Sequence, residues 1–312
     1  HIVRNNTIFA CEQTGMCGSM GASFSVIENN HIYDIWTKRQ FGGAEMGGVK
    51  FHAALDTKIA HNRIHNTGRG IWLDWMTQGT HVSSNLFYGN DLEDIFLEVN
   101  HGPFLVENNI LASHRSILEQ SQGGAYVHNL ICGKIHNYVE HGRYTPYFLP
   151  HSTDVAGLSI IPGGDDRFYN NLFATVDFEN SDKALGSFGL KGYEKTAYPM
   201  YVDGNVYYGA AVPFVKEDHK LVDASFVPDV RIEEEGDKVF LVIKNKDLKQ
   251  VETQMITTDK LGTAKLPKQR YEYPDGKPIQ INYDYLGNPR GEHPTSGPLE
   301  SLQAGEMRIQ VW

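Results

Sequence analysis

The sequence has few cysteines, no long apolar stretch and a deficit of positive charge. Its three cysteines, Cys11, Cys17 and Cys132, are odd in number and fit no metal-ligand spacing. Free buried thiols in a reducing compartment are therefore expected, with a Cys11–Cys17 disulfide as the alternative. The localisation stays open, with the cytoplasm favoured. No run reaches the roughly 18 apolar residues of a membrane span. The net charge of −10 argues against nucleic acid or an anionic membrane as partner.

The first two thirds of the chain also lack a helical period and instead repeat a short pattern, apolar-x-x-Asn-x-apolar or a close variant. Its asparagines are Asn6, Asn30, Asn62, Asn85, Asn109, Asn129, Asn171 and Asn205. Their spacings are 24, 32, 23, 24, 20, 42 and 34 residues. Each copy is a short alternating strand bounded by turn residues. This pattern predicts an all-β protein, a right-handed parallel β-helix of the pectate-lyase type.

The repeated asparagines are expected to be structural. At a turn, asparagine tolerates left-handed backbone geometry, and stacked copies can hydrogen-bond to their counterparts in neighbouring coils. No asparagine of the repeat is therefore a catalytic candidate.

The chain is expected to divide into two regions. Residues 1–217 form the coils that carry the active site, and a loop insertion lies near residues 133–167. This loop either walls a pocket, where Arg143 could reach a sugar hydroxyl or a carboxylate, or makes a packing or subunit contact. Residues 218–312 lose the asparagine pattern and become richer in charge. They are expected to form the terminal coil and a β-rich, antiparallel cap that covers its open strand edges.

Two similar segments, IWLD at residues 71–74 and IFLE at residues 95–98, are one coil apart. Strand alternation points their aliphatic residues inward and the carboxylates of Asp74 and Glu98 outward. Residues one coil apart lie on neighbouring strands about 4.8 Å apart. The two carboxylates are therefore predicted to be neighbours on the outer face of one sheet.

The same alternation extends this pair into an outward row. The row is expected to contain His52, Asp74, Glu98 and Glu119, flanked by Lys50, Trp72 and Phe96. Like charges on neighbouring strands destabilise a sheet. A chain that keeps such a row is expected to use it.

Three uses of the carboxylates are compared. A solvated surface is the ordinary explanation, but the aromatic neighbours make it less fitting. A calcium site needs six to eight oxygen ligands; because Lys50 lies beside three acids, a calcium-dependent polysaccharide lyase on the same scaffold is kept as an alternative. A non-catalytic β-helix that binds carbohydrate is the third. Adjacent strands give the separation of about 5–5.5 Å found in retaining glycosidases, and this favours a hydrolase without cofactor or metal.

The segments AEMGGVKFH, GIWLDWMTQGT, LFYGNDLEDIFLEVNHGPFLVENNI and SQGGAYVHNL resemble glycoside hydrolase family 120, the β-helix β-xylosidases. The resemblance implies that Asp74 is the nucleophile, Glu98 the general acid/base, and Glu45 a contact of the sugar in the first subsite. It also implies a β-sandwich inserted toward the N-terminal part of the family fold, so that this chain corresponds to the C-terminal half.

The resulting prediction is an exo-acting retaining enzyme that releases xylose from xylo-oligosaccharides. His52, Trp72 and Glu119 are predicted to bind substrate because of their places in the row alone. A homo-oligomer is expected, with an N-terminal half of the same protein as a further part.

Overall fold

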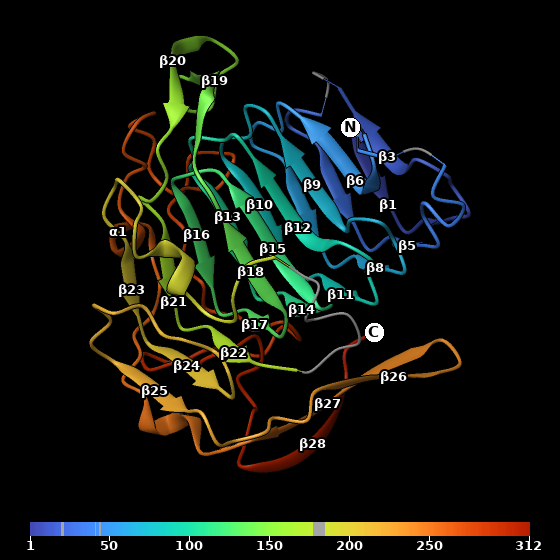
Figure 1. Ribbon diagram of the computed structural model, residues 1–312, viewed down its shortest axis with the longest axis vertical. Coiled ribbons are helices and arrows are strands. Elements are labelled where there is room, and N and C mark those ends of the chain that lie inside the picture. The colour runs from blue at the N-terminus through green and yellow to red at the C-terminus, as the bar shows by residue number, and fades with distance from the viewer. Residues whose placement is uncertain (20–21, 41, 44, 177–184) are drawn as a thin grey trace.

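The computed structural model describes residues 1–19, 22–40, 42–43, 45–176 and 185–312. Successive coils place short parallel strands in three sheets, which wrap around one apolar core (Figure 1). The predicted fold class, a right-handed parallel β-helix, is confirmed.

The three sheets form the walls of the solenoid. Sheet A contains, in spatial order, β1 (Ile2–Arg4), β4 (Val26–Glu28), β7 (Lys58–Ala60), β10 (Thr80–Ser83), β13 (Phe104–Glu107), β16 (Gly124–Val127), β21 (Arg167–Tyr169) and β23 (Tyr201–Asp203). Sheet B contains β2 (Thr7–Phe9), β5 (His31–Tyr33), β8 (Arg63–His65), β11 (Leu86–Tyr88), β14 (Ile110–Ala112), β17 (Leu130–Ile131), β22 (Leu172–Ala174), β24 (Asn205–Tyr208) and β25 (Lys220–Asp223). Sheet C contains β18 (Lys134–Asn137), β15 (Arg115–Gln120), β12 (Glu93–Glu98), β9 (Ile71–Asp74), β6 (Gly47–His52) and β3 (Thr14–Gly18).

Sheet C follows the alternation expected from the sequence. Ile71, Leu73, Ile95 and Leu97 are fully buried in the core inside the solenoid. The residues between them point outward, where Trp72 packs in a separate small cluster with Phe96 and Leu118. Every second residue of these strands is therefore available to the outer face.

The eight predicted asparagines form one continuous ladder along the solenoid. In every step the backbone N–H and the side-chain Nδ2 of one asparagine donate to Oδ1 of the next, at 2.8–3.1 Å. The last member, Asn205, donates in the same way to Oε1 of Glu217, at 3.0 and 2.8 Å. The expected hydrogen bonding between coils is confirmed.

The left-handed backbone lies one residue earlier than expected. Each residue directly before a ladder asparagine has a positive φ: Asn5, Asn29, His61, Ser84, Asn108, His128, Asn170 and Gly204. The ladder asparagines themselves carry the side-chain bonds. The left-handed backbone conformation and the side-chain hydrogen bonds, both expected of the asparagine, thus belong to two neighbouring residues.

The C-terminal region, for which a β-rich cap is predicted, contains a small antiparallel sheet and packs against the sides of the solenoid. Strands β26 (Arg231–Glu235), β27 (Lys238–Asn245) and β28 (Gly305–Gln310) form an antiparallel sheet. Leu241 and Ile243 of this sheet pack with Leu86 and Ile110, on the outer face of sheet B. Part of the segment between β27 and β28 packs with the outer face of sheet A through Ile256, Tyr271 and Ile279, which cluster with Leu105 and Val127. The outer faces of sheets A and B are therefore both covered.

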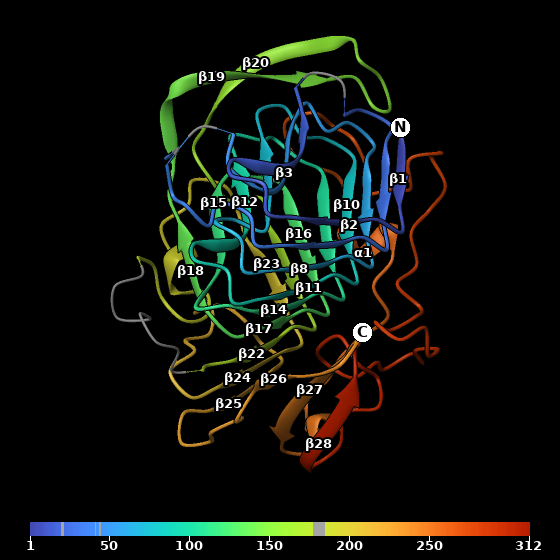
Figure 2. The same ribbon diagram turned by 90° about the vertical axis from the view of Figure 1, so that its right-hand side faces the viewer.

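The insertion predicted near residues 133–167 is more ordered than a loop. Its start supplies the coil strand β18, and β19 (Glu140–Phe148) pairs with β20 (Val155–Ile161) in an antiparallel hairpin. Figure 2 shows this hairpin running across the top of the molecule, above β12 and β15. The hairpin thus belongs to the side of the molecule on which sheet C lies.

Helix is scarce in the described residues. It consists of α1 (Thr258–Leu261) and the 3-10 turns η2 (Lys191–Tyr193) and η3 (Leu248–Gln250). Across the described part of the chain, no helix has the length and apolar character needed to cross a membrane.

The three cysteines are free, which confirms that part of the expectation and leaves no Cys11–Cys17 disulfide. Cys132 is buried and Cys11 half-buried, but Cys17 is exposed. The expectation that all three thiols are buried is wrong at Cys17, which lies on β3, at the edge of sheet C.

The ladder predicts a specific stability effect. Asn85→Ala removes the Oδ1 that accepts two bonds from Asn62. The side-chain Nδ2 of Asn62 keeps the carbonyls of Ile27 and Ala60, but its buried backbone N–H is left without a partner. We expect a loss of about 1–3 kcal/mol of unfolding free energy for this unpaired donor, measured by urea denaturation. The matched control is Asn6→Ala, at the exposed first asparagine of the ladder. An Asn85 variant as stable as the Asn6 variant would contradict the structural role of the ladder.

Candidate active site

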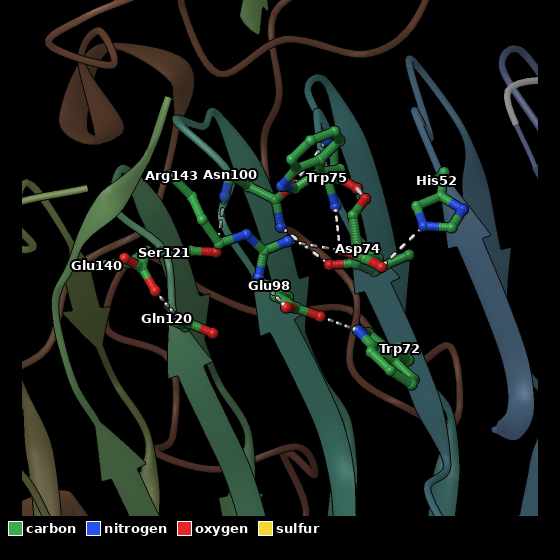
Figure 3. A network of polar contacts seen from close by, with 12 residues as sticks. His52, Trp72, Asp74, Trp75, Glu98, Asn100, Gln120, Ser121, Glu140 and Arg143 are labelled. Carbon is green, nitrogen blue, oxygen red and sulfur yellow. Dashed lines mark hydrogen bonds and ion pairs between the residues drawn. The ribbon is translucent and has the colours of Figure 1, made fainter. Parts of the chain in front are cut away.

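The side chains of interest lie in one row across the outer face of sheet C. His52 on β6 is in register with Asp74 on β9. Leu73 is in register with Leu97, which brings Asp74 opposite Glu98, the last residue of β12. Figure 3 shows the side chains of Asp74 and Glu98 on the same face of neighbouring strands. The structure thus places the two carboxylates as the sequence suggested; their catalytic roles stay predictions.

The predicted position of Glu119 is wrong. Glu98 is in register with Gln120, while Glu119 is in register with Leu97 and points into the solenoid. There Glu119 is fully buried and accepts a hydrogen bond from the hydroxyl of Tyr193. Burial raises the pKa of Glu119 to about 7. The coil from Glu98 to the next row position is one residue longer than assumed, and a slip of one residue moves a side chain to the other face.

Asp74 is held by several donors. Its Oδ2 accepts a hydrogen bond from Nζ of Lys50 at 2.9 Å and lies 2.8 Å from Nε2 of His52. Its Oδ1 accepts a hydrogen bond from the backbone N–H of Trp75 at 2.7 Å. These contacts fix the orientation of the Asp74 carboxyl group.

Lys50 joins Asp74 to Glu45. Its side chain is completely buried, and Nζ lies 2.7 Å from Oε2 of Glu45 as well as 2.9 Å from Oδ2 of Asp74. His52 Nε2 is 3.8 Å from Oε1 of Glu45. A buried ammonium needs such anionic partners, because an unpaired charge in this position would be strongly destabilising. The structure thus brings Glu45 and His52 to the same side of Asp74.

Glu98 is held from two sides. Its Oε2 accepts a hydrogen bond from the indole Nε1 of Trp72 at 3.0 Å, and its Oε1 accepts one from Nη1 of Arg143. The ring of Trp72 stacks on Phe96, and Nζ of Lys50 lies 4.6 Å from its centroid. Trp72 is therefore buried support for Glu98 in this structure, and its predicted contact with substrate stays a prediction.

The surroundings of Glu98 suit a group that carries a proton. Burial raises the pKa of its carboxyl above the ordinary value, a hydrogen bond from Arg143 partly offsets this, and the negative charge of Asp74 raises the pKa again. Asp74, in contrast, is bound by Lys50 and the Trp75 N–H. Two neighbouring carboxyl groups in such different environments are typical of an acid paired with a nucleophile.

Arg143 reaches the row from hairpin β19–β20. Besides its bond to Glu98, its Nη2 lies 3.9 Å from Oδ1 of Asp74, and its guanidinium lies 5.3 Å from the centroid of Trp75. The sequence suggested a sugar hydroxyl or a carboxylate as the partner of Arg143, and in the structure its partners are carboxylates. Nothing in the repeat pattern indicated that Arg143 contacts Asp74 and Glu98 at the same time.

The row continues beyond Glu98 with three polar residues: Gln120 at the end of β15, Tyr138 after β18, and Glu140 at the start of β19. The Nε2 of Gln120 donates to Oε2 of Glu140 at 2.9 Å, and the hydroxyl of Tyr138 donates to Oε1 of Gln120 at 2.7 Å. The two carboxylates thus lie between Glu45 and His52 on one side and these groups on the other.

Among the residues that the structure describes, no group of three or more His, Cys, Asp or Glu side chains is arranged to hold a metal ion. The positive charges next to Asp74 and Glu98 come from Lys50 and Arg143.

Three comparisons relate the chain to known proteins. Residues 1–131 match the family model described as a right-handed β-helix region. A sequence comparison with curated proteins gives no match. Two structures of mutants of the periplasmic alginate epimerase AlgG superpose with TM-scores of 0.35 and 0.33. They have 16% and 15% identity, cover 71% of this chain, and are themselves covered over 44% and 45% of their length.

One solved structure is far more similar. The complex of XylC with xylose superposes over 100% of this chain, with a TM-score of 0.92 and 42% sequence identity. The match covers 52% of XylC, so this chain spans about half the length of that protein. The similarity includes every segment on which the resemblance to a known family was based. The chain belongs to glycoside hydrolase family 120.

Proposed function

We propose that the protein is a retaining, exo-acting β-xylosidase that releases xylose from the ends of xylo-oligosaccharides. The observation that carries the proposal is the register of Asp74 and Glu98 on neighbouring strands of sheet C. Neighbouring strands are about 4.8 Å apart, and retaining glycosidases hold their two carboxyl groups about 5–5.5 Å apart.

In the first step Asp74 attacks the anomeric carbon, through Oδ1, because Oδ2 is engaged by Lys50. Glu98 transfers its proton to the glycosidic oxygen as the bond from that oxygen to the anomeric carbon breaks. The products are a covalent xylosyl ester on Asp74 and the shortened sugar, which leaves with its new hydroxyl group.

In the second step the ionised Glu98 takes a proton from water as the water oxygen attacks the anomeric carbon. The ester bond breaks, Asp74 regains its negative charge, and xylose leaves with its original β configuration. Glu98 is protonated again and the cycle is balanced. Its environment favours this exchange, since burial raises the pKa of its carboxyl.

The sugar itself is proposed from the similarity to XylC, which is solved as a complex with xylose. His52 lies directly beside Asp74, and Glu45 is linked to Asp74 through Lys50. Both are proposed to bind the hydroxyl groups of the terminal xylose. Gln120 and Glu140 continue the row past Glu98, on the side where the leaving part of the substrate would lie.

The nucleophile is tested with Asp74→Gly in the protein at its full natural length. Among 4-nitrophenyl β-glycosides, the wild type is expected to prefer the xyloside, and the variant to lose at least about a thousandfold in kcat. Azide should restore release of nitrophenol and yield α-xylosyl azide, identified by NMR. Asp91→Gly, at an exposed aspartate, is the control and should keep wild-type activity. A wild type inactive on the xyloside, or a rescued product of β configuration, would contradict the proposal.

The acid is tested with Glu98→Gln. General acid catalysis contributes about 10²–10⁴-fold, and it matters most when the leaving group is a poor one. The variant should therefore lose xylobiose hydrolysis by about that factor while keeping most of the first step with a dinitrophenyl xyloside. Equal losses on both substrates, measured as kcat/KM, would rule out Glu98 as the proton donor.

A further inference from the structure

Arg143 occupies a position that the reaction needs. Its guanidinium is hydrogen-bonded to Oε1 of Glu98 and lies 3.9 Å from Oδ1 of Asp74. It is delivered by hairpin β19–β20 and is not part of the stacked coils. Figure 3 shows it extending from the neighbouring hairpin strand toward both carboxylates. The arginine therefore bridges the two groups between which an anomeric carbon would have to lie.

Oδ1 of Asp74 and Oε1 of Glu98 cannot contact Arg143 and a reacting sugar at the same time. Asp74 Oδ2 is engaged by Lys50 and His52, whereas Oδ1 accepts one hydrogen bond, from the Trp75 N–H, and keeps a lone pair for attack on carbon. A reacting pair must approach to about 3–3.5 Å. Glu98 Oε2 accepts the Trp72 N–H, which leaves Oε1 to hold the proton. Arg143 faces both of these oxygens, so a productively bound sugar must displace it.

Displacement also changes the protonation of Glu98. A guanidinium carries donors and no acceptor, so the bond from Arg143 to Oε1 of Glu98 favours the ionised carboxylate and lowers the pKa of Glu98 against the effect of burial. Without this donor, burial and the charge of Asp74 both favour the protonated carboxyl. The same movement that admits the sugar therefore favours the acid form of Glu98.

We propose that Arg143 is a gate that the sugar displaces, and that its departure lets Glu98 take up one proton from solution. The proposal rests on the proposed function, because it assigns the sugar to the space between Asp74 and Glu98. In the balanced exchange, the sugar and one proton enter the site as the Arg143–Glu98 ion pair opens.

The two cations beside the carboxylates differ in how exposed they are. The side chain of Lys50 is completely buried, whereas that of Arg143 is 35% exposed. The titratable or charged groups beside the two carboxylates are Lys50, His52, Tyr138 and Arg143, with Glu140 next to Tyr138. Arg143 is the cation among them that is carried by the hairpin.

The gate is tested by calorimetry of xylose binding to the full-length protein, in buffers with different ionisation enthalpies. The wild type should take up as much as one proton per xylose across the pH range in which Glu98 titrates. Arg143→Met should bind xylose more tightly and with little proton uptake, since no ion pair has to open. Asp154→Asn also changes a charge, on the exposed turn of the same hairpin, and should keep the wild-type uptake.

Kinetics give a second, independent readout. The pH dependence of kcat/KM reports the free enzyme and that of kcat the substrate complex. A nearby cation shifts a carboxyl pKa by about 1–3 units. Arg143→Met should therefore move the basic limb of kcat/KM upward by about that amount and leave the basic limb of kcat in place. Arg143→Lys, which keeps a cation on the hairpin, should restore most of the wild-type profile.

The outcomes separate the gate from the proposed function. Proton uptake that depends on Arg143, without hydrolysis of xylosides, supports the gate and overturns the hydrolase. Hydrolysis accompanied by xylose binding without proton uptake overturns the gate alone. A basic limb that moves equally in kcat and kcat/KM also overturns it, since Arg143 would then stay beside Glu98 in the complex.

Discussion

The hydrogen bonds between successive asparagines fix the register of the coils, and the chemistry of the outer face depends on this register. In each step two donors of one asparagine meet a single acceptor in the next coil. Because strand side chains alternate between faces, a slip of one residue would turn Asp74 or Glu98 into the core. A structural feature inside the turns therefore determines which side chains meet outside.

The pair of carboxylates is stable because cations are placed on both sides. Lys50 lies against Asp74 and Glu45, and Arg143 against Glu98. The two cations differ in exposure: the side chain of Lys50 is buried within sheet C, whereas that of Arg143, on a hairpin, is 35% exposed. The proposed gate assigns the displacement to the exposed cation. Meanwhile the C-terminal region covers sheets A and B.

The sequence predicts those features that depend on a constant repeat. Asp74 and Glu98 could be placed because IWLD and IFLE match residue by residue over coils of regular length. The prediction for Glu119 was wrong because the coil after Glu98 is one residue longer than the prediction assumed. Strand side chains alternate between the two faces, so an error of one residue places a side chain on the opposite face. The contact of Arg143 spans 45 residues to Glu98, and no local pattern encodes how a hairpin folds back. The covered sheets did leave a signal, since outward residues such as Leu86 and Leu105 are apolar.

The relation between the two carboxylates can be tested by the configuration of the first sugar released. The full-length protein is mixed with 4-nitrophenyl β-xyloside, and the anomeric protons are followed by NMR before mutarotation equilibrates them. The account predicts β-xylose as the first product, since Asp74 attacks directly and its ester is then hydrolysed. Initial α-xylose would show a single displacement by water and would contradict the assignment of Asp74 as nucleophile.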